Sequence, residues 1–279
     1  MDVLAYLSER AQLVDRLLDR AVPPASEPPE SLHSAMRHLL FPGGKRFRPA
    51  LAFAGAEAVG GRPEAALPVA AAVELVHTYS LVHDDLPCMD DDDERRGKPT
   101  VHVAFGEATA VLAGDALLAA AFEVLAGAES LAAELRLASL RELARAAGSR
   151  ALVGGQADDL ASQAEEADPA RIESIHQRKT GVLLAVAVVE GARLAGAGEP
   201  SLARLRRLGE CLGLGFQIAD DLLDRGRDET SSLVRVLGEG AARRRAEALL
   251  EESLAQVEGW GERAEPLREL ARFAVRRNQ

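Results

Sequence analysis

Apolar residues recur at spacings of three and four along nearly the whole chain. The segments "LRLASLRELARAAGSRALVGGQADDLASQ" and "ARRRAEALLEESLAQVEGWGERAEPLRELARFAVRR" show this clearly, and they are rich in the strong helix formers Ala, Leu, Glu and Arg. The alternating Val, Ile and Thr pattern of β-strands is absent. The pattern therefore predicts an all-α protein.

Proline- and glycine-containing segments mark the places where these helices should end. They lie at residues 22–30, 41–49, 59–68, 96–100, 165–171 and 195–200. None is long enough to serve as a flexible linker between domains. We therefore expect a single helical domain over residues 1–279.

Three predicted helices are apolar on most of their sides, unlike the charged helices near the two ends of the chain. They read "LPVAAAVELVHTYSLVH", "GVLLAVAVVEGARL" and "LGECLGLGFQIADDLLD". Helices of this kind lie at the centre of a bundle.

Composition excludes several classes of protein. A net charge of −11 and a pI near 5.1 argue against a nucleic-acid partner, which would need a basic face. The first 20 residues carry charges every few positions, which is not the pattern of a signal or anchor, and the apolar run near residue 190 is cut by Glu190 and Arg193. We expect a cytoplasmic protein with no membrane span and with Cys88 and Cys211 as reduced thiols.

Two groups of aspartates stand at the ends of apolar helices. One contains Asp84, Asp85 and Asp90, and the other contains Asp220, Asp221 and Asp224. A single Asp-Asp pair is more often a helix cap or a solvated turn, but oxygen ligands without His or Cys favour Mg²⁺ or Ca²⁺. The glycine and terminal glutamate of a calcium loop are missing. Because Mg²⁺ often combines carboxylates with substrate phosphates, two such groups indicate a magnesium-diphosphate clamp.

Lysine is scarce, and two of the three lysines stand in distinctive contexts, "GGKRFRP" and "HQRKTG". The first lacks the spacing of a nucleotide-binding P-loop, and no strand precedes it. Alone, it could equally be a basic turn that caps a helix.

The chain resembles the trans-isoprenyl diphosphate synthases, the polyprenyl synthetase family, in five segments that occur in the family's order. They are "GGKRFRP" (43–49), "ELVHTYSLVHDDLPCMDDDDERRGKPT" (74–100), "GGQADDL" (154–160), "RKTG" (178–181) and "GFQIADDLLD" (215–224). The form of "DDLPCMD", Asp-Asp-x-x-x-x-Asp, is most like that of bacterial farnesyl diphosphate synthases. The resemblance implies an isoprenoid synthase-type helical bundle around a central cavity, usually in a homodimer.

The resemblance also implies the reaction, which joins isopentenyl diphosphate to an allylic diphosphate, dimethylallyl or geranyl, with three Mg²⁺ ions. Asp84 and Asp90 would hold two ions and Asp220 the third, and Asp85, Asp221 and Asp224 would support them.

Cationic and polar residues take the remaining roles that the resemblance implies. Isopentenyl diphosphate would be bound by Lys45, Arg48, His77 and Arg96, and the allylic diphosphate by Arg95 and Lys179. Lys179, Thr180 and Gln217 would face the cationic carbons as the catalytic set. Each has a simpler alternative: a solvated charge run for the arginines, a core histidine for His77, and a buried amide for Gln217.

Product length in this family depends on residues just before the first aspartate motif, here Tyr79 and Ser80. The ring of Tyr79, five residues before Asp84, favours farnesyl diphosphate, with geranyl and geranylgeranyl diphosphate as alternatives.

After Asp224 the family usually continues with a longer loop that carries two lysines, whereas this chain offers only Arg225 and Arg227 nearby. A catalytically weak subunit of a heteromeric synthase is therefore a further alternative. A terpene cyclase would have no use for Lys45, Arg48, His77 and Arg96.

Overall fold

The structure is a computed structural model that describes residues 1–162, 168–223 and 232–276. The chain divides into two compact units, each built from separate segments. We call Leu7–Ala50 with Leu67–Leu140 the N-terminal unit, and Met1–Tyr6 with Leu51–Ala66 and Arg141–Gln279 the C-terminal unit. The single domain expected over 1–279 stays a prediction.

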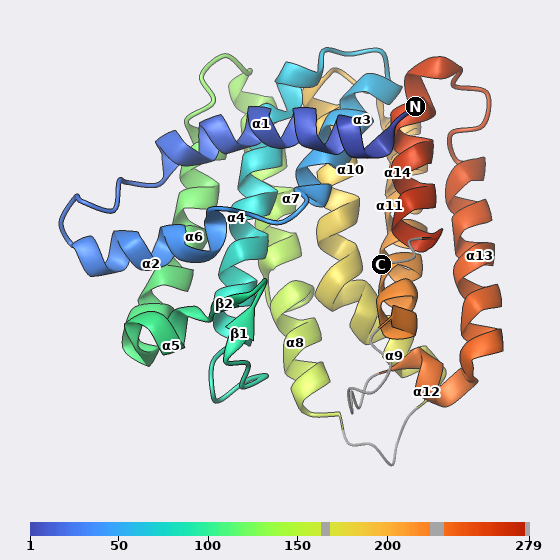
Figure 1. Ribbon diagram of the computed structural model, residues 1–279. Coiled ribbons are helices and arrows are strands. Elements are labelled where there is room, and N and C mark those ends of the chain that lie inside the picture. Colours follow the sequence, from blue (N-terminus) through green and yellow to red (C-terminus); the bar gives the residue numbers. More distant parts are fainter. Residues whose placement is uncertain (163–167, 224–231, 277–279) are drawn as a thin grey trace. The chain divides into compact units, whose positions relative to one another are not determined.

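The all-α prediction is confirmed (Figure 1). The helices that end at Ala21, Leu40, Ala58 and Leu194 stop directly before predicted proline- and glycine-containing segments, whereas those that end at Ala126, Ala147 and Ala255 stop outside them. The helices are α1 (Val3–Ala21), α2 (Glu30–Leu40), α3 (Phe47–Ala58), α4 (Leu67–Asp84), α5 (Val101–Phe105), α6 (Glu107–Ala126), α7 (Ala133–Ala147), α8 (Leu152–Leu160), α9 (Pro169–His176), α10 (Val182–Leu194), α11 (Glu199–Leu223), α12 (Leu233–Leu237), α13 (Glu239–Ala255) and α14 (Glu265–Arg276). Short 3₁₀ turns cover Pro63–Ala66 and Glu262–Ala264, and a π-helical turn covers Gln177–Gly181.

The N-terminal unit is built around α4, which lies side by side with α6 (Figure 1). Most side chains of α4 are buried, as its apolar sequence predicted. His83, near the end of α4, lies 3.0 Å from the carbonyl oxygen of Val111 in α6 through its Nε2 atom. The contact holds the end of α4, where the first aspartates stand, against α6.

The C-terminal unit contains the other two predicted core helices, α10 and α11, which pack on each other (Figure 1). Small residues bring them close: a Cβ atom at Gly213 would lie only 2.3 Å from Cα of Gly181. A side chain at Gly213 would push the π-helical turn away from α11, and one at Gly181 would clash with the side chain of Gln177. The glycines of "LGECLGLGF" therefore allow close packing, which brings Gln217 into contact with Thr180.

One hairpin departs from the all-helical expectation. Strands β1 (Glu94–Arg95) and β2 (Lys98–Pro99) pair antiparallel, and Arg96 and Gly97 form the turn with φ values of 57° and 74°. Positive φ at both central residues is typical of tight two-residue hairpins. Strands of two residues are too short to show an alternating pattern, so the sequence could not reveal them.

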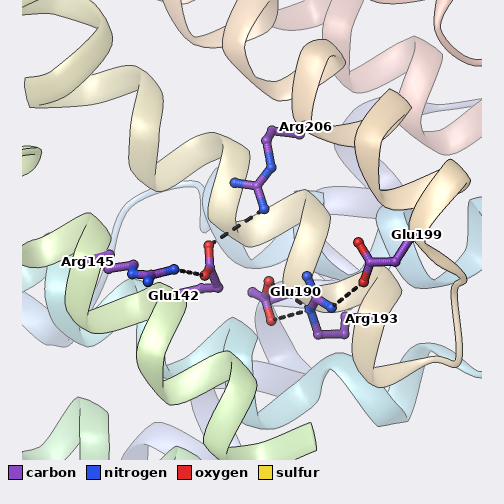
Figure 2. Close-up of polar contacts among 6 residues, drawn as sticks. All are labelled: Glu142, Arg145, Glu190, Arg193, Glu199 and Arg206. Carbon is purple, nitrogen blue, oxygen red and sulfur yellow. Dashed lines mark hydrogen bonds and ion pairs between the residues drawn. The ribbon is translucent and has the colours of Figure 1, made fainter.

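Ion pairs surround the carboxyl end of α10 (Figure 2). Glu190 is buried, and its carboxylate oxygens accept hydrogen bonds from Arg193 Nε at 3.1 and 3.2 Å; Arg193 also reaches Glu199 at 3.2 Å. Arg145 and Arg206 lie 2.8 and 3.6 Å from Glu142. The two charges that interrupt the apolar run of α10 are thus paired with each other.

Two helical segments, Pro63–Asp84 and Glu107–Ala126, are long and apolar enough to cross a membrane by length and composition alone. This differs from the expectation that no segment reaches that length, because a single charged residue near the middle of each, Glu74 and Asp115, leaves the rest of the segment largely apolar. Of the apolar window in the first segment 72% is buried, against 39% in the second. The first is therefore a core helix, and the second leaves apolar side chains at the surface.

Candidate active site

The first aspartate motif, in the N-terminal unit, is a loop that folds back on the end of α4. The backbone N–H of Asp90 donates to the carbonyl oxygen of Asp84 at 2.8 Å, and that of Met89 donates to Leu86 at 2.8 Å. Asp84 is half-buried and Asp90 is exposed. The four residues between Asp85 and Asp90 thus reverse the direction of the chain, so that the first and last aspartates of the motif are neighbours.

Asp85 has a different environment from its neighbours. It is buried, Arg95 donates to its Oδ1 atom, and its Oδ2 atom is buried with no hydrogen-bond partner in the part of the chain that the structure describes. Burial raises the pKa of this carboxyl above its usual value, although Arg95 opposes the rise. Arg95 also donates to Asp92 at 2.9 Å. Asp85 therefore fixes Arg95, and its predicted role in supporting the Mg²⁺ ions stays a prediction.

His77, on α4, lies among the arginines of the predicted isopentenyl diphosphate site. Its pKa is held well below 6.5, first by burial and then by the positive charges of Arg48, Arg96, Arg95 and Arg46. The imidazole is therefore neutral at pH 7. The same arginines make its surroundings attractive to an anion, so this part of the predicted set comes together within one unit.

The hairpin turn that carries Arg96 is anchored on α2 and on the segment after it. His38 Nε2 lies 2.8 Å from the carbonyl oxygen of Pro99, and Lys98 Nζ donates to that of Phe41 at 3.1 Å. A Cβ atom at Gly44 would lie 2.9 Å from a guanidinium nitrogen of Arg96. The second glycine of "GGKRFRP" thus makes room for Arg96, while Lys45 is exposed and Arg48 half-buried.

Tyr79 and Ser80, predicted to set product length, are both buried on α4. The ring of Tyr79 packs edge-on against His83 with ring centres 5.8 Å apart. Its hydroxyl is buried without a hydrogen-bond partner among the described residues, and burial, helped by Asp84, raises its pKa to about 12. The Ser80 hydroxyl donates to the carbonyl oxygen of His77 at 3.0 Å.

In the C-terminal unit, Lys179 stands on the π-helical turn and pairs with α8. Its ammonium group lies 2.6 Å from Asp159 Oδ2, and the neighbouring Arg178 lies 2.7 Å from Asp158 Oδ2. A Cβ atom at Gly155 would lie 2.4 Å from the backbone nitrogen of Lys179, so α8 and the turn are in close contact. Both aspartates belong to the segment "GGQADDL", and its sequence alone did not indicate that they would pair with this basic turn.

Thr180, Gln217 and Asp221 form a chain of hydrogen bonds in the same unit. The Thr180 hydroxyl donates to Gln217 Oε1 at 3.1 Å, and Gln217 Nε2 donates to Asp221 Oδ1 at 3.2 Å. The backbone N–H of Leu233 donates to the other oxygen of Asp221 at 3.0 Å. Burial raises the pKa of Asp221, while His176 opposes the rise.

Both carboxylate oxygens of Asp221 therefore accept hydrogen bonds from the protein. Asp220, the residue before it, is half-buried. Asp224, Arg225 and Arg227 lie outside the described residues. Gln217 does bond to a neighbouring element, as its simpler alternative required, and that bond also fixes Thr180.

Within the described ranges, no three His, Cys, Asp or Glu residues are arranged to hold a metal ion by themselves. Mg²⁺ takes one or two carboxylates and completes its shell with water and substrate phosphates. The oxygen-only donors Asp84 and Asp90, with the unpartnered Asp85 Oδ2 behind them, fit such an ion. The second cluster lies in the other unit, so the joint clamp stays a prediction.

The fold and these sites define a helical enzyme of the isoprenoid synthase class. A sequence model of the polyprenyl synthetase family matches residues 29–241, which include all five motifs. The chain therefore belongs to the polyprenyl synthetase family and is an enzyme of the prenyltransferase type.

Relatives and a solved structure match almost the whole chain. The heterodimeric geranylgeranyl pyrophosphate synthase large subunit 1, chloroplastic, of Arabidopsis thaliana is 42% identical over 99% of this chain and 80% of its own length. The geranylgeranyl diphosphate synthase of Cyanophora paradoxa is 40% identical, over 99% and 97%. An FPP/GFPP synthase of Zymomonas mobilis has a TM-score of 0.90 at 41% identity, over 98% and 99%.

Proposed function

We propose that this protein condenses isopentenyl diphosphate with allylic diphosphates and that its main product is geranylgeranyl diphosphate. The observation that carries the reaction is the loop that places Asp90 beside Asp84 at the end of α4, next to the arginines around His77. The relatives from Arabidopsis and Cyanophora are named geranylgeranyl diphosphate synthases, which supports the C20 product over the C15 product favoured by Tyr79 alone.

The N-terminal unit binds isopentenyl diphosphate in this proposal. Lys45, Arg48 and Arg96 supply positive charge, and His77 supplies a neutral imidazole that can donate a hydrogen bond to a phosphate oxygen. Arg95 binds the allylic diphosphate from its position on Asp85. The forked guanidinium suits such contacts because it can offer two parallel donors.

Asp84 and Asp90 hold two Mg²⁺ ions and Asp220 a third, and Asp85, Asp221 and Asp224 support these ligands. Bound Mg²⁺ supplies Lewis-acid stabilisation for the charge that develops on the departing diphosphate. In the C-terminal unit, Lys179 contacts the allylic diphosphate. The oxygen atoms of Thr180 and Gln217, held to each other, present dipoles to the allylic cation.

The test uses purified protein, Mg²⁺ and isopentenyl diphosphate with dimethylallyl, geranyl or farnesyl diphosphate in separate tubes. Products are identified by mass after removal of phosphate. A C20 product from all three acceptors supports the proposal. A C15 product that farnesyl diphosphate does not extend would assign farnesyl synthesis, the candidate that the buried ring of Tyr79 favours.

No product from folded protein would refute condensation by this chain alone. The alternative is then a weakly active subunit, because two of the Arabidopsis relatives are named large subunits of heterodimers. Turnover that appears only after a second synthase subunit is added would establish that alternative.

We also propose that the protein is a homodimer that uses the exposed side of α5 and α6. Val103, Val111 and Leu112 are 49%, 42% and 57% exposed there, and a second copy would cover these apolar side chains. Light scattering of the wild type and of a Val111→Glu/Leu112→Glu variant tests this, with a dimer and a monomer as the expected masses. The predicted cytoplasmic location stays open, because several relatives are named chloroplastic.

A further inference from the structure

Arg46, between the two predicted ligands Lys45 and Arg48, has an environment unlike either. Lys45 is exposed and Arg48 is half-buried, whereas Arg46 is only 2% exposed. Its backbone adopts a left-handed conformation with φ of 50°, which is uncommon for a residue other than glycine. This reversal turns Arg46 into the protein, and its carbonyl oxygen then accepts from Ala50 in the first turns of α3 at 3.0 Å.

The guanidinium of Arg46 joins three elements of the N-terminal unit. Its Nε donates to Asp15 Oδ1 of α1 at 2.8 Å, and its Nη1 donates to Glu74 Oε1 of α4 at 2.7 Å. Its Nη2 donates to the carbonyl oxygen of Leu40, at the end of α2. The side chain of Glu74 is only 3% exposed, so Arg46 and Glu74 form a buried ion pair.

These bonds connect the basic loop to the turn of α4 that carries His77. Glu74 lies three residues before His77, so both belong to the same turn of the helix. The first glycine of the motif follows from the same arrangement, because a Cβ atom at Gly43 would lie 2.0 Å from Cζ of Arg46. Glycine at position 43 therefore leaves the space that the Arg46 guanidinium occupies.

We propose that Arg46 is a positioning residue for isopentenyl diphosphate, and that it fixes Lys45 and Arg48 relative to His77 without touching the substrate. The inference rests on the proposed function of that site. Lysine cannot replace arginine here, since one ammonium group cannot hold Asp15, Glu74 and Leu40 in the geometry of a planar fork.

The first test is Arg46→Lys in the full-length protein. We expect the KM for isopentenyl diphosphate to rise about tenfold or more, because misplacement of binding groups by about 1 Å is costly. The KM for the allylic diphosphate and the kcat at saturation should change less than about threefold. If Arg46 were purely structural, Arg46→Lys would lower the melting temperature but would not raise the KM for isopentenyl diphosphate selectively over that for the allylic diphosphate.

Arg193→Lys is the matched control. Arg193 also serves a buried glutamate, Glu190, and a more exposed carboxylate, Glu199, in the C-terminal unit (Figure 2). It belongs to none of the proposed binding sites. We expect Arg193→Lys to lower the melting temperature while both KM values stay within about twofold. Equal behaviour of the two variants, with no selective effect on isopentenyl diphosphate, would overturn the proposal.

A second variant and a direct measurement keep the test decisive. If Arg46→Lys does not fold, Arg46→Met/Glu74→Met removes both buried charges together, which proteins tolerate better than the loss of one partner. Calorimetric titration with isopentenyl diphosphate alone then measures binding without turnover. Weakened binding supports the role of Arg46 even if the wild type fails to condense its substrates, and unchanged binding contradicts it.

Discussion

The proposed product length can be tested most directly at a single residue, Tyr79. Its ring is buried and its hydroxyl has no hydrogen-bond partner among the described residues. We expect Tyr79→Ala, which removes the ring, to shift the products of a farnesyl diphosphate incubation beyond C20. Tyr79→Phe is the matched control and should keep the wild-type products. Identical product masses from the alanine variant would show that other side chains limit the chain.

His77 gives a prediction for stability against pH. Its folded-state pKa lies well below 6.5, so the unfolded chain binds the proton first as the pH falls. The neutral imidazole therefore contributes stability above pH 6.5, and this is lost as the pH drops from 6.5 toward the folded pKa. Urea unfolding at pH 7.5 and 5.5 should show a smaller loss in His77→Gln than in the wild type. Equal losses would mean that His77 titrates normally.

Residue identity alone could not separate Arg46 from Arg48. The motif "GGKRFRP" contains three cations of similar chemistry within four residues, and which of them is buried depends on a left-handed backbone at Arg46. A left-handed backbone at one residue leaves no periodic pattern in the sequence from which it could be predicted. Lys179 illustrates the same limit, since its partner Asp159 lies 20 residues away along the chain.

At the scale of elements, the π-helical turn Gln177–Gly181 and its contact with α8 give a paired prediction. Asp159→Asn removes the charge that holds Lys179, and Asp158→Asn does the same for Arg178. We expect the first to raise the KM for the allylic diphosphate about tenfold, the size of one hydrogen bond to a charged group. The second should change it less than about threefold. Steady-state kinetics with varied geranyl diphosphate measures both.

The longer helices were predictable as elements because each shows apolar residues at a regular spacing over ten or more positions. Pro and Gly residues then indicated where several of them end. The buried positions of α4, α10 and α11 followed from the same signal. The β1–β2 hairpin and the π-helical turn were not predictable, because two-residue strands and one extra residue per turn leave no period to detect. Both irregular elements carry predicted site residues, Arg95, Arg96, Lys179 and Thr180.

At the scale of the whole molecule, both acidic clusters are required if they serve the Mg²⁺ ions of one diphosphate. Chelation of Mg²⁺ by EDTA should then abolish condensation, and excess Mg²⁺ should restore it. Asp84→Asn and Asp220→Asn should each lower kcat by about two to three orders of magnitude, the scale observed when a group that stabilises developing charge is removed. Glu134→Gln, at an exposed position of α7, is the control and should keep wild-type kcat.

The double variant decides whether the two clusters act together. Residues that act as one unit give strongly non-additive losses, so Asp84→Asn/Asp220→Asn should be little worse than the more damaging single variant. Independent sites would instead give losses that multiply. The comparison needs kcat for the four proteins at saturating substrates and several Mg²⁺ concentrations. A multiplicative result would mean that each unit binds its own ligand, and the clamp inferred from the sequence would then be wrong.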